Sequence, residues 1–159
     1  MADPIGIRIQ NLYKIFGPTP QKHIADVRAG MSKDELRDQH GHVLGLRDIN
    51  IDMPAGQIQV VMGLSGSGKS TLIRHINRLI EPTAGELWAG EQDVMALSPR
   101  ALRQFRRERT AMVFQKFALF PHFTVLENAE YGLQVRGLGR KARREAAAQW
   151  IERVGLKGY

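Results

Sequence analysis

The chain has 159 residues, 43% of them hydrophobic and 25% charged, with a formal net charge of +7 and no cysteine. This composition is typical of a globular chain long enough for one ordinary domain, and it excludes disordered, collagenous and disulfide-stapled proteins as well as thiol nucleophiles and thiolate metal sites. The longest uncharged run lies between Asp52 and Lys69 and is rich in Gly, Ser and Gln, so it cannot span a bilayer as a helix. We therefore expect a soluble, intracellular protein.

Alternating apolar and polar residues predict half-buried strands over residues 5–10 and 46–53, and the sequence Pro54-Ala55-Gly56 predicts a turn after the second strand. The residues between the two strands, 18–45, are polar and interrupt the strand pattern. We interpret them as an insertion.

Two features stand out within this insertion. Ser32 and Glu35 have the spacing of a capping box, which predicts that a short helix begins there. His40 and His42 have the composition of half a metal site, but no further ligands lie nearby in the sequence. We therefore expect them to lie in a solvent-exposed loop.

The second half of the chain continues with a buried strand over residues 57–62, a glycine-rich loop and an amphipathic helix from Lys69 that stops at Glu81-Pro82. Two strands are predicted next, over residues 86–88 and 110–115, with a helix capped by Ser98 between them. Two helices follow. The first begins at the capping box Thr124–Glu127, and the second is amphipathic, with an apolar face that includes Trp150 and Val154.

Residues 63–70 read Gly-Leu-Ser-Gly-Ser-Gly-Lys-Ser and match the phosphate-binding pattern G-x-x-x-x-G-K-[ST] at every fixed position. Glycines let successive backbone N–H groups point at one phosphate, and the N-terminus of the following helix adds partial positive charge. A glycine-rich turn that binds nothing is the simpler interpretation, but such turns seldom carry Lys and Ser at these two positions. The loop therefore predicts binding of a nucleoside triphosphate.

Each residue of this loop has an expected role. Lys69 would reach the β- and γ-phosphates, the Ser70 hydroxyl would bind Mg²⁺, and Thr71 can donate to the α-phosphate. The predicted phosphate-binding residues are Gly63, Ser65, Gly66, Ser67, Gly68, Lys69, Ser70 and Thr71.

Four segments together resemble the ATP-binding subunit of an ABC transporter: KIFG at 14–17, GLSGSGKST at 63–71, NRLIEPTAGE at 77–86 and MVFQKFALFPHFTVLEN at 112–128. More narrowly, the chain resembles the ATPase that energises uptake of glycine betaine, proline betaine and related quaternary amines, and the insertion at 18–45 points to this subfamily. The resemblance covers essentially the whole chain. It implies the α/β fold of a P-loop NTPase, with residues 1–159 forming the N-terminal half of one ABC ATPase domain and containing an antiparallel β subdomain.

The resemblance also assigns residues outside the phosphate loop. Phe16 falls where an aromatic ring stacks on adenine, and Gln115, within the Q-loop region 112–123, matches the glutamine that contacts Mg²⁺ and the attacking water. The implied catalytic residues are Lys69 and Gln115, the implied Mg²⁺ ligands are Ser70 and Gln115, and the implied cofactors are ATP and Mg²⁺. Without the resemblance, Phe16 is interpreted as a core residue at a strand end and Gln115 as a polar cap.

The segment 116–123 is unusually apolar for a loop, and in the family this region forms part of the cleft that receives a coupling helix of the membrane permease. A satellite hydrophobic cluster explains the same composition. The implied partners are the permease, a second copy of the ATPase subunit and, indirectly, a periplasmic or extracellular substrate-binding protein. The implied location is peripheral, on the cytoplasmic side of the cell membrane.

The signature loop, the Walker B aspartate, the catalytic glutamate and the switch histidine of the family do not occur in these 159 residues. We expect a chain truncated before these motifs, which binds nucleotide weakly and hydrolyses negligible ATP by itself. One alternative is a natural non-catalytic module that docks through residues 116–123.

A second alternative is an ATPase that acts on nucleic acid. Residues 100–144 hold 11 Lys or Arg against 3 Asp or Glu, which suits nucleic acid, anionic lipid or an acidic protein. However, a pair of solvated helices explains these charges without a partner, and the segment lacks aromatic residues interleaved on strands. We therefore expect no nucleic-acid partner.

Overall fold

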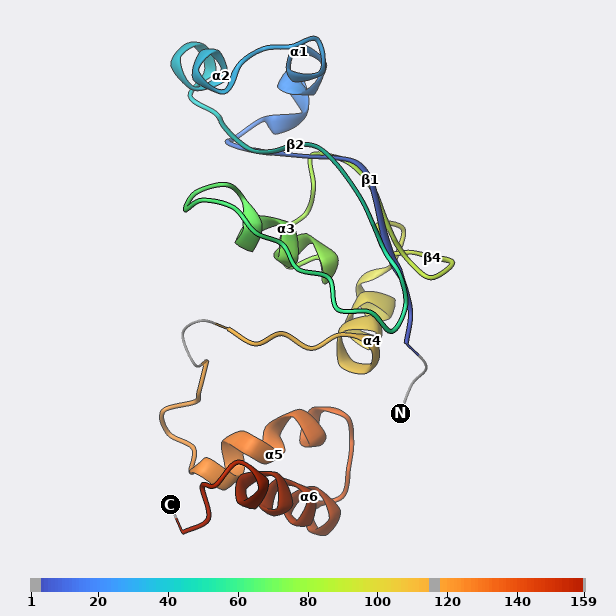
Figure 1. Cartoon of the computed structure of the whole chain (residues 1–159), viewed down its shortest axis with the longest axis vertical. Coiled ribbons are helices and arrows are strands. Elements are labelled where there is room, and N and C mark those ends of the chain that lie inside the picture. Colours follow the sequence, from blue (N-terminus) through green and yellow to red (C-terminus); the bar gives the residue numbers. More distant parts are fainter. Residues whose placement is uncertain (1–3, 115–117, 159) are drawn as a thin grey trace. The chain divides into compact units, whose positions relative to one another are not determined.

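The computed structural model describes residues 4–114 and 118–158. The chain divides into two compact units, Met1–Leu102 and Arg103–Tyr159. The first unit contains a β-sheet and the second is helical (Figure 1). No helix in the described residues is long and apolar enough to cross a bilayer.

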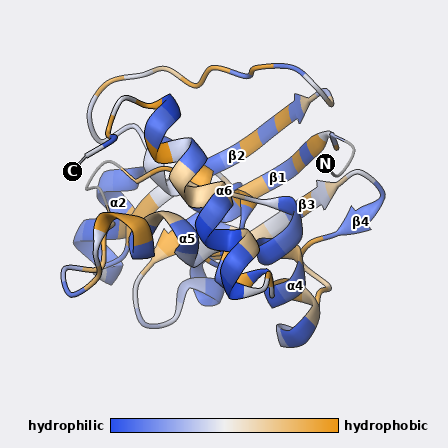
Figure 2. Cartoon of the chain, turned by 90° about the horizontal axis from the view of Figure 1, so that it is seen from below, coloured by the Kyte–Doolittle hydropathy of each residue, from blue (hydrophilic) through white to orange (hydrophobic). Residues whose placement is uncertain are grey.

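A four-stranded antiparallel sheet with the order β2-β1-β3-β4 forms the frame of the first unit. Its strands are β1 (Ile7–Phe16), β2 (Val43–Met53), β3 (Ala84–Ala89) and β4 (Gln92–Asp93). In Figure 2, β1 and β2 carry alternating hydrophobic and hydrophilic bands, because successive side chains of a strand point to opposite faces. The predicted antiparallel subdomain is confirmed, as are the strands predicted near 5–10, 46–53 and 86–88.

Short helices fill the segment between β1 and β2, namely η1 (Pro20–His23), α1 (Ile24–Arg28) and α2 (Lys33–His40). The predicted capping box at the start of α2 is confirmed: Ser32 Oγ accepts from the Glu35 N–H at 3.1 Å, and the Glu35 carboxylate accepts from the Ser32 N–H at 2.7 Å. Val27 of α1 and Leu36 of α2 are buried in one cluster with Ile15 of β1. Apolar packing therefore anchors these helices on the sheet.

The expectation of an exposed loop at His40 and His42 is wrong for His42, whose side chain is buried. Its Nδ1 lies 2.6 Å from the carbonyl oxygen of His40, and its Nε2 accepts from the Thr19 N–H at 3.4 Å. Because a carbonyl only accepts, Nδ1 donates in this contact, and both ring nitrogens have hydrogen-bond partners. The ring of His23 packs against it with centroids 4.4 Å apart. No set of three His, Cys, Asp or Glu side chains in the described part of the chain is placed to hold a metal ion.

The prediction of strands over residues 57–62 and 110–115 is wrong for the residues that the structure describes. Residues 57–62 and 110–114 contain no strand, and neither segment joins the sheet. Most of their apolar side chains are open to solvent, with Ile58 95% exposed and Val113 98% exposed, and Val61 and Met112 are half-buried. The sequence pattern fails here because a strand needs a hydrogen-bonded neighbour, which a short apolar run does not supply.

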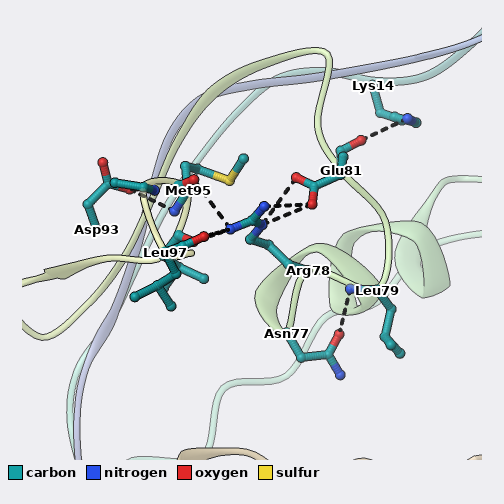
Figure 3. A network of polar contacts seen from close by, with 10 residues as sticks. Lys14, Asn77, Arg78, Leu79, Glu81, Asp93, Met95 and Leu97 are labelled. Carbon is teal, nitrogen blue, oxygen red and sulfur yellow. Dashed lines mark hydrogen bonds and ion pairs between the residues drawn. The ribbon is translucent and has the colours of Figure 1, made fainter. Parts of the chain in front are cut away.

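The helix that follows the glycine-rich loop, α3 (Lys69–Ile76), ends before the predicted stop at Glu81-Pro82. Arg78 has a left-handed backbone with φ of 50°, which no continuing helix adopts. Its Nε and Nη2 bind the Glu81 carboxylate at 2.8–3.1 Å (Figure 3). Its Nη1 lies 2.9–3.3 Å from three carbonyl oxygens of one loop, those of Val94, Met95 and Leu97. The guanidinium thus ties the end of α3 to that loop.

The second unit is built on α5 (Val125–Val135) and α6 (Arg140–Arg153), which pack against each other, and it includes the end of α4 (Pro99–Arg109). The predicted cap of α4 is confirmed by the hydrogen bond from the Ala101 N–H to Ser98 Oγ at 3.3 Å. The capping box at Thr124 is confirmed as well. The predicted apolar face of α6 is buried only in part, since Trp150 and Val154 are mostly exposed.

Candidate functional site

The glycine-rich loop bends sharply just before α3. Gly66 and Gly68 have φ angles of 78° and 92°, whereas Ser65 and Ser67 do not have positive φ. Glycine adopts such left-handed angles without steric cost. Alternation between negative and positive φ turns successive N–H groups toward one side and forms a nest for an anion. The φ angles of the loop suit such a nest.

Lys69 is the first residue of α3, and its side chain reaches back over the loop. Its Nζ donates to the carbonyl oxygens of Gly63 and Leu64, at 2.7 Å each. The first turn of α3 contains no acidic residue, so nothing within that turn neutralises the partial positive charge of the helix N-terminus. Ser70 is exposed beside it, and a hydroxyl is an oxygen ligand of the type that Mg²⁺ takes. The arrangement suits a polyphosphate with its Mg²⁺ ion.

Gly45 of β2 lies between this loop and the ring of Phe16. A Cβ atom at Gly45 would lie 2.6 Å from Cε2 of Phe16, and a Cβ atom at Gly68 would lie 2.9 Å from the Gly45 carbonyl oxygen. Both distances are shorter than the contacts that Cβ atoms make in proteins, so a side chain at Gly68 would collide with the strand backbone and one at Gly45 would displace the Phe16 ring. The first unit thus brings together the predicted base contact and the predicted phosphate contacts, which are Phe16 and residues 63–71.

The ring of Phe16 is 39% exposed, so part of it is open to a stacking partner. Sequence reasoning missed Gly45. The available signal was an isolated glycine at the edge of a predicted strand, which often marks a close approach of another segment. The predicted Mg²⁺ ligand Gln115 lies outside the described residues, so its role stays a prediction.

The second unit carries a separate apolar surface, formed by residues 118–123 together with α5 and α6. Its aromatic rings, those of Phe120, Phe123 and Tyr131, pack with centroids 4.7–6.2 Å apart. Asn128 fixes the loop, because its Oδ1 accepts from the Phe120 N–H at 2.8 Å and its Nδ2 donates to the carbonyls of Phe120 and Phe123 at 3.2 Å. A cavity of about 580 Å³ is lined by Leu119, Phe120, Pro121 and Phe123 from the loop and by Trp150 and Ile151 from α6.

Comparison with known proteins places these features in a family. The family profile described as ABC transporter matches residues 46–159. The glycine betaine/proline betaine transport system ATP-binding protein ProV of Escherichia coli is 45% identical over 98% of this chain, and the glycine betaine transport ATP-binding protein OpuAA of Bacillus subtilis is 44% identical over 98%. The trimethylamine N-oxide transport system ATP-binding protein TmoW of Ruegeria pomeroyi is 43% identical over 99%.

The chain spans only 39% of the length of ProV, 37% of OpuAA and 46% of TmoW. Among solved structures, the ATP-binding cassette MJ0796, in a dimeric post-hydrolysis state bound to ADP and Pi, aligns with a TM-score of 0.73 and 27% identity. That alignment covers 92% of this chain and 56% of the other. The resemblance drawn from the sequence motifs is confirmed, and the chain belongs to the ABC transporter family of ATP-binding proteins.

Proposed function

We propose that this chain is the nucleotide-binding part of an ABC ATPase subunit that powers import of glycine betaine, proline betaine or a related quaternary amine. The meeting of Phe16, Gly45 and the phosphate loop in one unit carries the proposal of an ATP site. The solute class rests on the names of the relatives, which handle betaines or trimethylamine N-oxide.

In this proposal, the N–H groups of residues 63–68 and the N-terminus of α3 hold the phosphates. Lys69 exchanges its bonds to the loop carbonyls for phosphate oxygens. Ser70 and Gln115 hold Mg²⁺, which when bound supplies positive charge against the γ-phosphate. Phe16 stacks on the base. Lys69 and Gln115 act in hydrolysis, which we propose for the complete subunit.

The proposed partners are a second copy of the subunit, a membrane permease and, through the permease, a substrate-binding protein. The apolar surface of the second unit is the proposed permease contact, because its aromatic rings and its cavity of about 580 Å³ are built to accept an apolar segment. We propose that both units belong to one ATPase domain, located peripherally on the cytoplasmic side of the membrane.

Substitution of Lys69 by alanine tests the nucleotide site. We expect MgATP affinity, measured by isothermal titration calorimetry, to fall at least about tenfold, since charge-assisted hydrogen bonds to phosphate are lost. Lys141→Ala is the matched control, because Lys141 is an exposed lysine in the first turn of α6. Equal affinity of Lys69→Ala and the parent chain would remove Lys69 from the site, and no MgATP binding by the parent chain would refute the proposed function.

A further inference from the structure

The side chain of Lys14 lies over the ring of Phe16. The two residues are two positions apart on β1, so their side chains share one face of the strand. Lys14 Nζ is 5.0 Å from the centre of the Phe16 ring, within the range in which a cation is attracted to an aromatic face. Lys14 is half-buried, which strengthens this attraction relative to a fully solvated pair.

The ammonium group of Lys14 is held from its other side as well. Nζ donates to the carbonyl oxygen of Glu81 at 2.7 Å, and the carboxylate of the same Glu81 is bound by Arg78 just after α3 (Figure 3). Burial lowers the pKa of Lys14, and the nearby Glu81 carboxylate opposes that shift. A chain of polar contacts therefore runs from the end of the phosphate-loop helix through Glu81 and Lys14 to the Phe16 ring.

Contacts on two sides thus restrict the Phe16 ring. Lys14 covers part of the ring, and the missing side chain of Gly45 leaves room for its Cε2 edge. A ring that is already oriented loses less rotamer freedom when a ligand stacks on it, and so it binds more tightly than a free ring.

We propose that Lys14 is a positioning residue for the nucleotide base. It holds the Phe16 ring in the orientation on which a purine stacks, and it links that ring to the helix that carries the phosphate loop. This inference rests on the proposed nucleotide site and adds a residue that makes no contact with the phosphates.

Lys14→Met tests the inference, because methionine keeps the apolar stem and removes the charge. The 159-residue chain is titrated with MgATP and, separately, with magnesium tripolyphosphate, which has phosphates but no base. We expect Lys14→Met to bind MgATP about two- to fivefold more weakly, as the loss of one cation–ring contact implies, with tripolyphosphate affinity unchanged. A structural defect in the phosphate loop would weaken both ligands together.

Two further variants sharpen the comparison. Arg8→Met is the matched control, since Arg8 lies on the same strand and its guanidinium carbon is 5.6 Å from the centre of the Trp88 ring, away from the phosphate loop. It should change neither affinity. Lys14→Arg keeps a cation that stacks on rings and should retain the parent MgATP affinity.

The outcomes separate the two proposals. If the parent binds MgATP and Lys14→Met binds it equally well, the role of Lys14 is refuted while the proposed function stands. Equal weakening toward MgATP and tripolyphosphate also refutes it, because Lys14 would then act on the phosphate loop. If the parent binds neither ligand, the proposed function itself fails.

Discussion

Removal of the Arg78 side chain tests whether polar contacts to a loop outweigh the backbone strain at the end of α3. Arg78 is only 14% exposed, and its guanidinium faces the carbonyl groups of residues 94, 95 and 97 on one side and Glu81 on the other. Its left-handed backbone is an unfavourable conformation for any residue except glycine. The two effects oppose each other, and their magnitudes decide the outcome.

The polar contacts are the larger effect. Nη1 carries two hydrogens, so it supports two of the three carbonyl contacts at once. At about 1.5 kcal/mol for each hydrogen bond from a charged donor, these contribute about 3 kcal/mol to the free energy of unfolding. The Glu81 side chain is 55% exposed, and such an ion pair adds about 1 kcal/mol or less. The left-handed backbone costs about 1 kcal/mol, which only glycine recovers.

We therefore expect Arg78→Ala, which loses both sets of contacts, to lower the free energy of unfolding by about 3–4 kcal/mol, Arg78→Gly by about 2–3 kcal/mol and Glu81→Gln by about 1 kcal/mol or less. The chain has 2 tryptophans. Trp88 lies on β3 of the first unit. Urea unfolding followed by Trp88 fluorescence in a Trp150→Phe background therefore reports on the first unit alone. An Arg78→Gly chain more stable than the parent would refute the reasoning, because strain would then outweigh the carbonyl contacts.

Two further predictions concern the first unit and use the same unfolding assay. Ser32→Ala should lower its stability by about 1 kcal/mol, because the Glu35 N–H loses its acceptor at the start of α2; an unchanged midpoint would show that the cap contributes nothing. Acid should destabilise the unit, because burial above all, and the nearby charge of Lys14, hold the pKa of His75 below its usual value against the opposing effects of the hydrogen bond to the Thr71 carbonyl and of the Glu81 carboxylate. The unfolded chain then binds the proton more readily, so stability is full above about pH 6.5 and is lost as the pH falls through the lowered value. His75→Phe should flatten this loss, and an identical acid limb in that variant would contradict the assignment.

Sequence reasoning succeeded where both partners of an interaction lie within a few residues. The capping boxes at Ser32–Glu35 and Thr124–Glu127 join residues three positions apart, so their spacing alone predicts the geometry. The alternation in β1 and β2 succeeded for a related reason. These strands pair with each other in an antiparallel ladder, and each exposes one face, which gives a clear period of two.

It failed where the partner lies far along the chain. The apolar residues of 57–62 have the pattern of a strand but no hydrogen-bonded neighbour in the described sheet, and no local feature of the sequence reveals this. The end of α3 at Ile76 depends on carbonyls that follow Arg78 by 16 to 19 residues. His42 was expected in a solvent-exposed loop because no further metal ligands lie nearby in the sequence, and its hydrogen-bond partner Thr19, 23 residues earlier, gave no local signal of burial.

The candidate site shows the same difference between local and long-range contacts. Its phosphate side is a single short segment, 63–71, in which glycines and Lys69 adopt their geometry through local backbone angles and loop carbonyls. The base side that we propose involves Lys14, which reaches Glu81 across 67 positions, and Gly45, which leaves room for the Phe16 ring. The sequence motifs therefore point to the phosphate loop and to Phe16, whereas the contacts that Lys14 and Gly45 make with the Phe16 ring are visible only once the sheet is folded.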